Sequence, residues 1–137
     1  MAFKNDGLLI QEYVYDFAVD GGATGQIELQ AKVNKDPLPE GAVVSNVYAK
    51  VITACTSGGS ATVSWGDGTD VDGYSGTAKA VAALTANAAF DGKGDSGALL
   101  PDVVGSAGKF TVDIAVAALT AGKIVFLVEY IYPSVEA

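Results

Sequence analysis

The chain has 137 residues, with 16 acidic side chains against 8 basic ones and a formal net charge of −8. The basic residues are all lysines and histidine is absent, which excludes an imidazole base or zinc ligand and a guanidinium clamp for phosphate. The negative charge opposes binding to nucleic acid or to an anionic membrane. Residues 1–137 fit a single domain, and we expect no enzymatic activity, no catalytic residue and no cofactor.

The N-terminal part predicts an arm followed by two strands. Residues 1–8 are expected to form the arm, and their start lacks the apolar core of a signal peptide, so we expect synthesis in a cytoplasm. From Tyr13 to Val19 and from Gln26 to Val33, every second residue is apolar. This period of two is typical of half-buried antiparallel strands. The Asp20-Gly21-Gly22 sequence between them predicts a turn.

The central part predicts one long strand and a tight turn. Residues Ala42 to Cys55 are apolar on both faces in places and long for one strand, so we expect a bulge near Ser45 and Asn46. The following Ser57-Gly58-Gly59-Ser60 sequence is typical of a hairpin turn, because two glycines supply positive φ angles. Cys55 is the single cysteine, and we expect it to be a small buried side chain.

Residues 66–108 are the least regular part, and we interpret them as a variable, loop-rich insertion containing one strand. Within them Thr77–Phe90 fits either a short helix or a strand, because its alanines favour helix and its glycine-bounded surroundings favour strand. Phe110–Val116 alternates again, and Lys123–Tyr132 is almost continuously apolar. A strand that is apolar on both faces is either central in a sandwich or covered by another subunit.

These elements predict an all-β fold, a single-domain antiparallel β-sandwich of jelly-roll type with about eight strands. The apolar last strand also predicts self-association, as a homotrimer or, as second choice, a dimer. The residues expected to line an interface with another protein subunit are Phe126, Val128, Tyr130, Tyr132 and Trp65.

The densest polar cluster follows Trp65 and contains Asp67, Asp70 and Asp72 in a glycine-rich stretch. Carboxylates at alternate positions can converge on Ca²⁺, which takes about six to eight oxygen ligands. No glutamate follows at the required offset, so these three residues are weak metal candidates and we predict an exposed acidic turn instead. Trp65 and Tyr74 are candidates for a sugar-stacking platform, although packing of Trp65 in the core or at an interface is favoured.

Three segments, Tyr15–Leu29, Thr53–Val63 and Val112–Tyr130, combine turn glycines with alternating core residues. Together they resemble the capsid decoration (cement) proteins of tailed bacteriophages, although residues 66–108 lie outside the resemblance. The resemblance implies a homotrimeric β-sandwich on the outer surface of the capsid in the virion. There it would bind across junctions of major capsid protein subunits and stabilise the assembled shell. The resemblance assigns no catalytic residue.

Two other functions remain open from the sequence. One is a receptor- or glycan-binding module of a phage fibre or head fibre, in which Trp65 and the acidic loop would make the contacts. The other is an acid-dependent hydrolase of jelly-roll type, which the absence of a histidine base disfavours.

Overall fold

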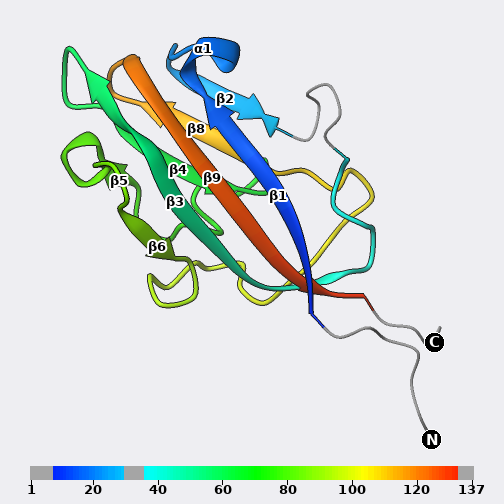
Figure 1. Cartoon of the computed structure of the whole chain (residues 1–137). Helices are drawn as coiled ribbons and strands as arrows, with labels where there is room; N and C mark the ends of the chain where they lie inside the picture. The colour runs from blue at the N-terminus through cyan, green and yellow to red at the C-terminus, as the bar shows by residue number, and fades with distance from the viewer. Residues whose placement is uncertain (1–7, 30–35, 133–137) are drawn as a thin grey trace, which may run out of the picture.

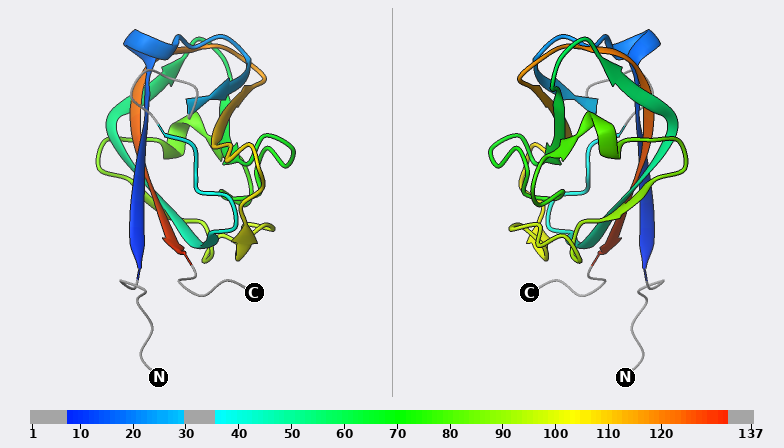
Figure 2. Two further views of the ribbon diagram at one scale, coloured as in Figure 1. Left: turned by 90° about the vertical axis from the view of Figure 1, so that its right-hand side faces the viewer. Right: turned by 90° about the vertical axis from the view of Figure 1, so that its left-hand side faces the viewer.

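The computed structural model describes residues 8–29 and 36–132, which form two packed antiparallel sheets (Figures 1 and 2). The front sheet contains β1 (Leu9–Asp16), β3 (Val43–Ser57), β6 (Ala89–Asp91), β7 (Asp102–Val103) and β9 (Leu119–Ile131). The back sheet contains β2 (Gly25–Glu28), β4 (Thr62–Gly66), β5 (Lys79–Ala80) and β8 (Thr111–Ala115). The expected all-β sandwich is therefore confirmed.

The strand order is that of a jelly roll. The front sheet has the order β1-β9-β3-β6, with β7 also paired to β3, and the back sheet has the order β2-β8-β4-β5. If β7 is left aside, each sheet has four strands and the chain passes repeatedly from one sheet to the other. This is the arrangement of a double-sheet jelly roll. The hairpin expected at Gly58 and Gly59 is wrong, because this turn carries the chain from β3 in one sheet to β4 in the other.

The first strand differs from the expected one at both of its ends. It begins at Leu9 and ends at Asp16, and a short helix, α1 (Phe17–Asp20), replaces the last part of the expected strand. The Asp16 carboxylate accepts a hydrogen bond from the Ala18 amide at 3.0 Å, and the Asp16 amide donates one to Asp20 Oδ2 at 2.9 Å. These local bonds give the backbone an alternative to strand pairing, which alternation alone does not reveal.

The second expected strand is shorter in the structure, where β2 ends at Glu28. Residues 30–33 of that prediction lie outside the described residues, as does the expected arm up to residue 7. No helix among the described residues has the length and hydropathy needed to cross a membrane.

The bulge expected in the long strand is confirmed, because the pairing of β3 with β9 shifts between Val44 and Asn46. Asn46 is buried, and its side chain occupies the irregularity with three hydrogen bonds. Its Oδ1 accepts from the amides of Val47 and Lys93, and its Nδ2 donates to the Asp91 carboxylate. The bulge thus connects β3 to the loop that follows β6.

Residues 66–108 are part of the sandwich, because they supply β5 to the back sheet and both β6 and β7 to the front sheet. The ambiguous stretch Thr77–Phe90 contains β5, a single 3-10 turn η2 (Val81–Ala83) and the start of β6. Its alanines therefore form no α-helix. The expectation of one strand in this region is corrected to three short ones.

Aromatic rings join the two sheets through the core. Phe110 stacks on Tyr13 and Tyr74, with centroids 5.0 and 5.9 Å away, and packs at 5.1 Å against Phe126. Phe126 in turn lies 5.1 Å from Trp65. Burial of these side chains supplies the main driving force for folding.

Candidate functional site

Three of the residues expected to line an interface lie inside the core. Trp65, Phe126 and Val128 are each 0% exposed, and both aromatic rings are enclosed by other side chains of the same chain. They cannot contact a partner while the domain is folded, so the prediction is corrected for these three. Tyr130 is half-buried, and Tyr132, just beyond β9, is exposed.

The apolar character of β9 has two separate explanations. Ile124, Phe126 and Val128 point into the sandwich and are fully buried, because β9 is paired on both sides, with β1 and with β3. Val125 and Leu127 point to the outer face of the front sheet and are half-buried. Among the described residues no further layer covers that outer face (Figure 2).

The outer face carries an apolar strip at the end where β1 begins and β9 ends. This strip is defined here as Ile10, Val43, Val103 and Ile131. Val43 is paired with Ile131 on one side and with Val103 on the other, so the three side chains share one face. Ile10 lies one row further along that face, opposite Glu129. Ile10, Val103 and Ile131 are 55%, 67% and 38% exposed. The sheet thus presents aliphatic side chains to solvent across four strands.

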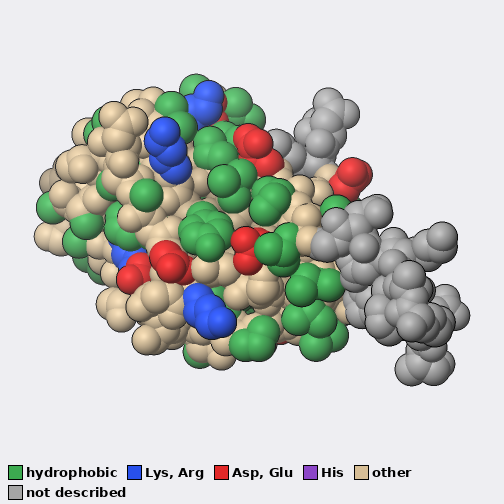
Figure 3. Space-filling view, turned by 60° about the horizontal axis from the view of Figure 1, so that its bottom comes forward, with side chains coloured by type: hydrophobic (Ala, Val, Ile, Leu, Met, Phe, Trp, Pro, Cys, Tyr) green, Lys and Arg blue, Asp and Glu red, His purple; other side chains and the backbone are tan. Residues whose placement is uncertain are grey.

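The chain enters and leaves the sandwich at the same end. Leu8 directly precedes β1, Tyr132 directly follows β9, and both are exposed. In the space-filling view, hydrophobic side chains run across this face toward the grey terminal residues, with both carboxylates and lysines among them (Figure 3). This end of the molecule is therefore the candidate docking surface.

The acidic loop after β4 is built from local hydrogen bonds. The Asp67 carboxylate accepts from the amides of Thr69 and Asp70 at 2.9 and 2.8 Å. Gly66 permits this fold, because a β-carbon at that position would lie 1.8 Å from the carbonyl oxygen of Asp70. Residues 8–29 and 36–132 contain no group of three or more potential metal ligands.

The carboxylates of Asp70 and Asp72 interact with one another within this loop. A side-chain hydrogen bond with Asp72 raises the pKa of Asp70, and burial acts in the same direction. Whether calcium binds there remains a prediction to be tested.

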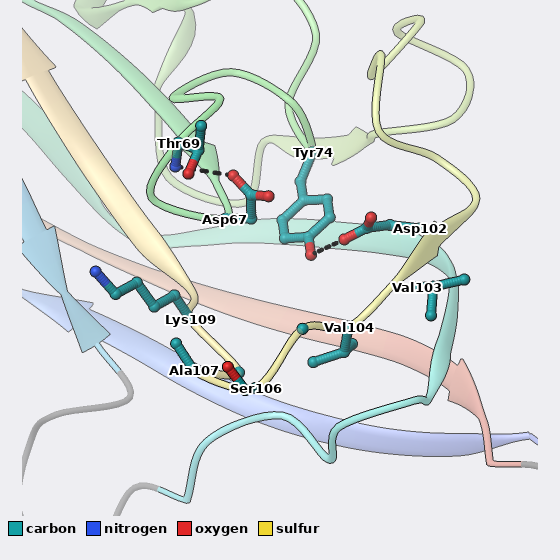
Figure 4. A pocket seen from close by; sticks show the side chains of 11 residues that line it. Asp67, Thr69, Tyr74, Asp102, Val103, Val104, Ser106, Ala107 and Lys109 are labelled. Carbon is teal, nitrogen blue, oxygen red and sulfur yellow. Dashed lines mark hydrogen bonds between the residues drawn. The ribbon is translucent and has the colours of Figure 1, made fainter.

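A pocket of about 340 Å³ lies between the acidic loop and residues 102–109 (Figure 4). Asp67 and Lys109 line it on one side, and Asp102 and Val103 on the other. The Tyr74 hydroxyl donates a hydrogen bond to Asp102 Oδ2 at 2.7 Å. Burial raises the pKa of Tyr74 well above its usual value, and the bond to Asp102 adds to this, so the hydroxyl stays protonated.

The sugar-stacking platform is not present in this structure. Trp65 and Tyr74 are 0% and 1% exposed, so neither ring offers a face to a sugar. Their burial follows from their positions, with Trp65 at the inward-facing end of β4 and Tyr74 in the stack with Phe110. Tyr74 does line the pocket of Figure 4, together with two carboxylates, a lysine and small or aliphatic side chains of residues 103–107.

Sequence reasoning missed most of the apolar strip. Ile10 lies before the first strand that was expected, and Val103 lies in the part interpreted as an insertion. The only signal in the sequence was the presence of consecutive apolar residues near both ends of the described chain, Leu8-Leu9-Ile10 and Ile131-Tyr132. Nothing local indicated that Val43 would lie between Ile131 and Val103.

No protein-family model matches the chain, and no curated protein matches it. Two solved structures share its fold. A chain of the cyanophage Pam1 capsid asymmetric unit aligns with a TM-score of 0.62 at 20% identity, over 97% of this chain and 89% of that chain. A chain of the acidic stable capsid structure of Helicobacter pylori bacteriophage KHP30 aligns with a TM-score of 0.59 at 17% identity, over 99% and 98% of the two chains. The same sandwich therefore occurs in chains from two bacteriophage capsids.

Proposed function

We propose that the chain is a structural protein of a bacteriophage virion that decorates the assembled capsid on its outer surface. The observation that carries this proposal is the fold similarity to chains from two phage capsids over almost the whole of this chain. The similarity also covers 89% and 98% of those chains, so each is close in size to this single sandwich. A small capsid chain of this kind fits an accessory subunit that binds to a larger shell.

The mechanism is stabilisation by binding. A protein that binds across a junction of major capsid protein subunits stabilises the bound arrangement by RT ln(1 + [L]/Kd) per site. Because such a site exists only after assembly, the chain should bind capsids and not free capsid subunits. Synthesis takes place in the host cytoplasm, and the chain itself forms a homotrimer. It carries out no reaction and needs no cofactor.

Purified virions of the phage that encodes the chain provide the test. Quantitative mass spectrometry should find the chain in a fixed copy number relative to the major capsid protein. Particles stripped of the chain should lose integrity at lower temperature and regain it when the purified protein is added back. Equal disruption temperatures for stripped and decorated particles would contradict the stabilising role.

A second candidate is a receptor- or glycan-binding module of a phage fibre or head fibre. The polar pocket of Figure 4 favours it, because Asp67, Asp102 and Lys109 can hydrogen-bond a polar ligand. A glycan array separates the two functions, since specific binding that is lost in an Asp102→Ala variant would support the second candidate.

A further inference from the structure

The apolar strip is unusual for the solvent side of an antiparallel sheet. One face of such a sheet commonly packs on the core while the other is polar. Here five of the ten large exposed hydrophobic residues of the described chain lie at the end where the chain enters and leaves: Leu8, Ile10, Val103, Ile131 and Tyr132. Contiguous exposed apolar surface of this kind marks an interaction site.

Two described carboxylates, those of Glu12 and Glu129, lie on the same face as the strip. Glu129 lies between Ile10 and the Ser45 bulge, where its carboxylate accepts a hydrogen bond from Ser45 Oγ at 2.8 Å. Glu12 follows Ile10 on the same face of β1 and is exposed. No ion pair within the described residues includes either glutamate.

The described lysines that form ion pairs do so elsewhere on the molecule. Lys79 contacts Asp95 at 2.7 Å and Lys109 contacts Glu28 at 2.8 Å. Lys123, on the same face as the strip but at the far end of β9, lies 4.0 Å from Asp16. The strip is thus an aliphatic surface bordered by two carboxylates that lack a basic partner in the described chain.

We infer that the apolar strip is the surface with which the chain docks on the capsid shell, and that the shell presents there an apolar patch bordered by lysine or arginine side chains. The inference rests on the proposed decoration function and assigns it a surface. Apolar burial supplies the affinity, and the two glutamates favour a basic counterpart and faster association.

A second copy of the chain fits the strip less well than the shell does. Strip against strip would bring Glu12 and Glu129 of one copy toward the same residues of the other, and the strip itself contains no lysine. Like charges placed opposite one another across an interface cost free energy. Self-association through this end is therefore disfavoured, and the strip stays free for a different protein.

The test compares two double variants of the full chain. Ile131→Asp with Val103→Asp places charges in the strip, and Val19→Asp with Val116→Asp places them at two other positions, 75% and 76% exposed, outside it. Each is mixed with phage particles stripped of the wild-type protein, and binding is measured by co-sedimentation. The strip variant should bind at least about tenfold more weakly, a change of about 1.4 kcal/mol, and the control should bind like wild type. The strip variant should keep the thermal midpoint of the wild-type protein, and the control should unfold at the same or a higher temperature, because Asp tolerates the positive φ angle of position 116 better than Val does. Both should keep the sedimentation coefficient of the wild-type protein.

The outcomes separate the inference from the proposed function. If wild type binds stripped particles and the strip variant binds equally well, the inference is overturned and the decoration function stands. If wild type does not bind, the decoration function itself fails. A strip variant that changes the sedimentation coefficient would show a self-contact and also overturn the inference. If the strip variant does not fold, Glu12→Lys with Glu129→Lys replaces it, and unchanged affinity at low salt would then contradict the basic counterpart.

Discussion

The ring of Tyr13, from β1 of the front sheet, stacks on the ring of Phe110, just before β8 of the back sheet, with centroids 5.0 Å apart and planes 8° from parallel. Both side chains are 0% exposed. Phe110 also contacts Tyr74 and Phe126 at 5.9 and 5.1 Å. One ring therefore joins strands from both sheets to the loop after β4.

Replacing Phe110 by Ala should lower the free energy of unfolding by about 3–5 kcal/mol, because it removes these ring contacts and leaves a cavity between the sheets. Urea unfolding followed by the fluorescence of Trp65, the single tryptophan, measures the change. Val71→Ala at an exposed loop position is the matched control and should stay within about 0.5 kcal/mol of wild type. A loss below about 1 kcal/mol for the Phe110 variant would mean that the stack does not hold the sheets together.

The second prediction concerns the contact between β9 and β3 at Gly122. A β-carbon at Gly122 would lie 2.6 Å from the Cys55 sulfur, and φ at Gly122 is +146°, which disfavours other residues. Gly122→Ala should therefore destabilise the protein by about 1–3 kcal/mol in urea unfolding. Gly58→Ala is the control, because nothing lies within 4 Å of the added carbon.

Cys55→Ala should restore part of the loss caused by Gly122→Ala, because it removes the sulfur that the new methyl group meets. A double-mutant cycle reports this coupling directly. Purely additive effects would assign the cost to the backbone conformation alone. Cys55 is buried as expected from the sequence, and burial raises the pKa of its thiol to about 11.

The sequence predicted those features that depend on local pattern. Alternation in Phe110–Val116 identified core side chains such as Val112 and Ile114, which are buried. The length of the third strand and its apolar residues on both faces predicted its bulge, because an extra residue in one strand bends that strand and disrupts the regular pairing. Alternation failed where side chains bond to nearby backbone, as Asp16 does at the start of α1.

The order of the strands and the composition of the apolar strip could not be predicted in the same way. Each depends on pairings between distant segments, such as Val43 with Ile131 and Val103. Turn glycines indicate that the chain reverses, but the same signal serves a hairpin within a sheet and a crossing between sheets. The Gly58-Gly59 turn is of the second kind. Whether an apolar strand face is covered is likewise decided by the layer opposite it.

The third prediction concerns alkaline pH. Burial raises the pKa of Tyr13 from about 10 to about 12, and its hydroxyl donates a hydrogen bond to the carbonyl oxygen of Asp36 at 2.6 Å. Burial also raises the pKa values of Tyr15 and Tyr74. The folded state binds these protons more tightly than the unfolded state, so their contribution is complete below pH 10 and is lost as pH rises through about 12.

The free energy of unfolding should therefore fall between about pH 10 and about pH 12, together with the appearance of phenolate absorbance. Tyr13→Phe should be less stable than wild type by about 1 kcal/mol at neutral pH, because it loses one hydrogen bond. Its stability should then decline less steeply across the alkaline range. An equally steep decline in the variant would show that Tyr13 does not contribute to the pH dependence.

The last prediction concerns Val116, in the turn between β8 and β9. Its φ angle is +73° and its side chain is 76% exposed. A β-branched residue in this region carries a steric cost of about 1–2 kcal/mol, and an exposed side chain regains little of that cost by packing. Asn adopts positive φ angles with less strain and keeps a side chain, so Val116→Asn should stabilise the protein by about 1 kcal/mol in urea unfolding. Val19→Asn is the matched control, because Val19 is 75% exposed in α1 and has no positive φ angle to relieve. If the Val116 variant unfolds at the same or a lower urea concentration than wild type, the valine at this turn makes a stabilising contact that offsets its backbone conformation.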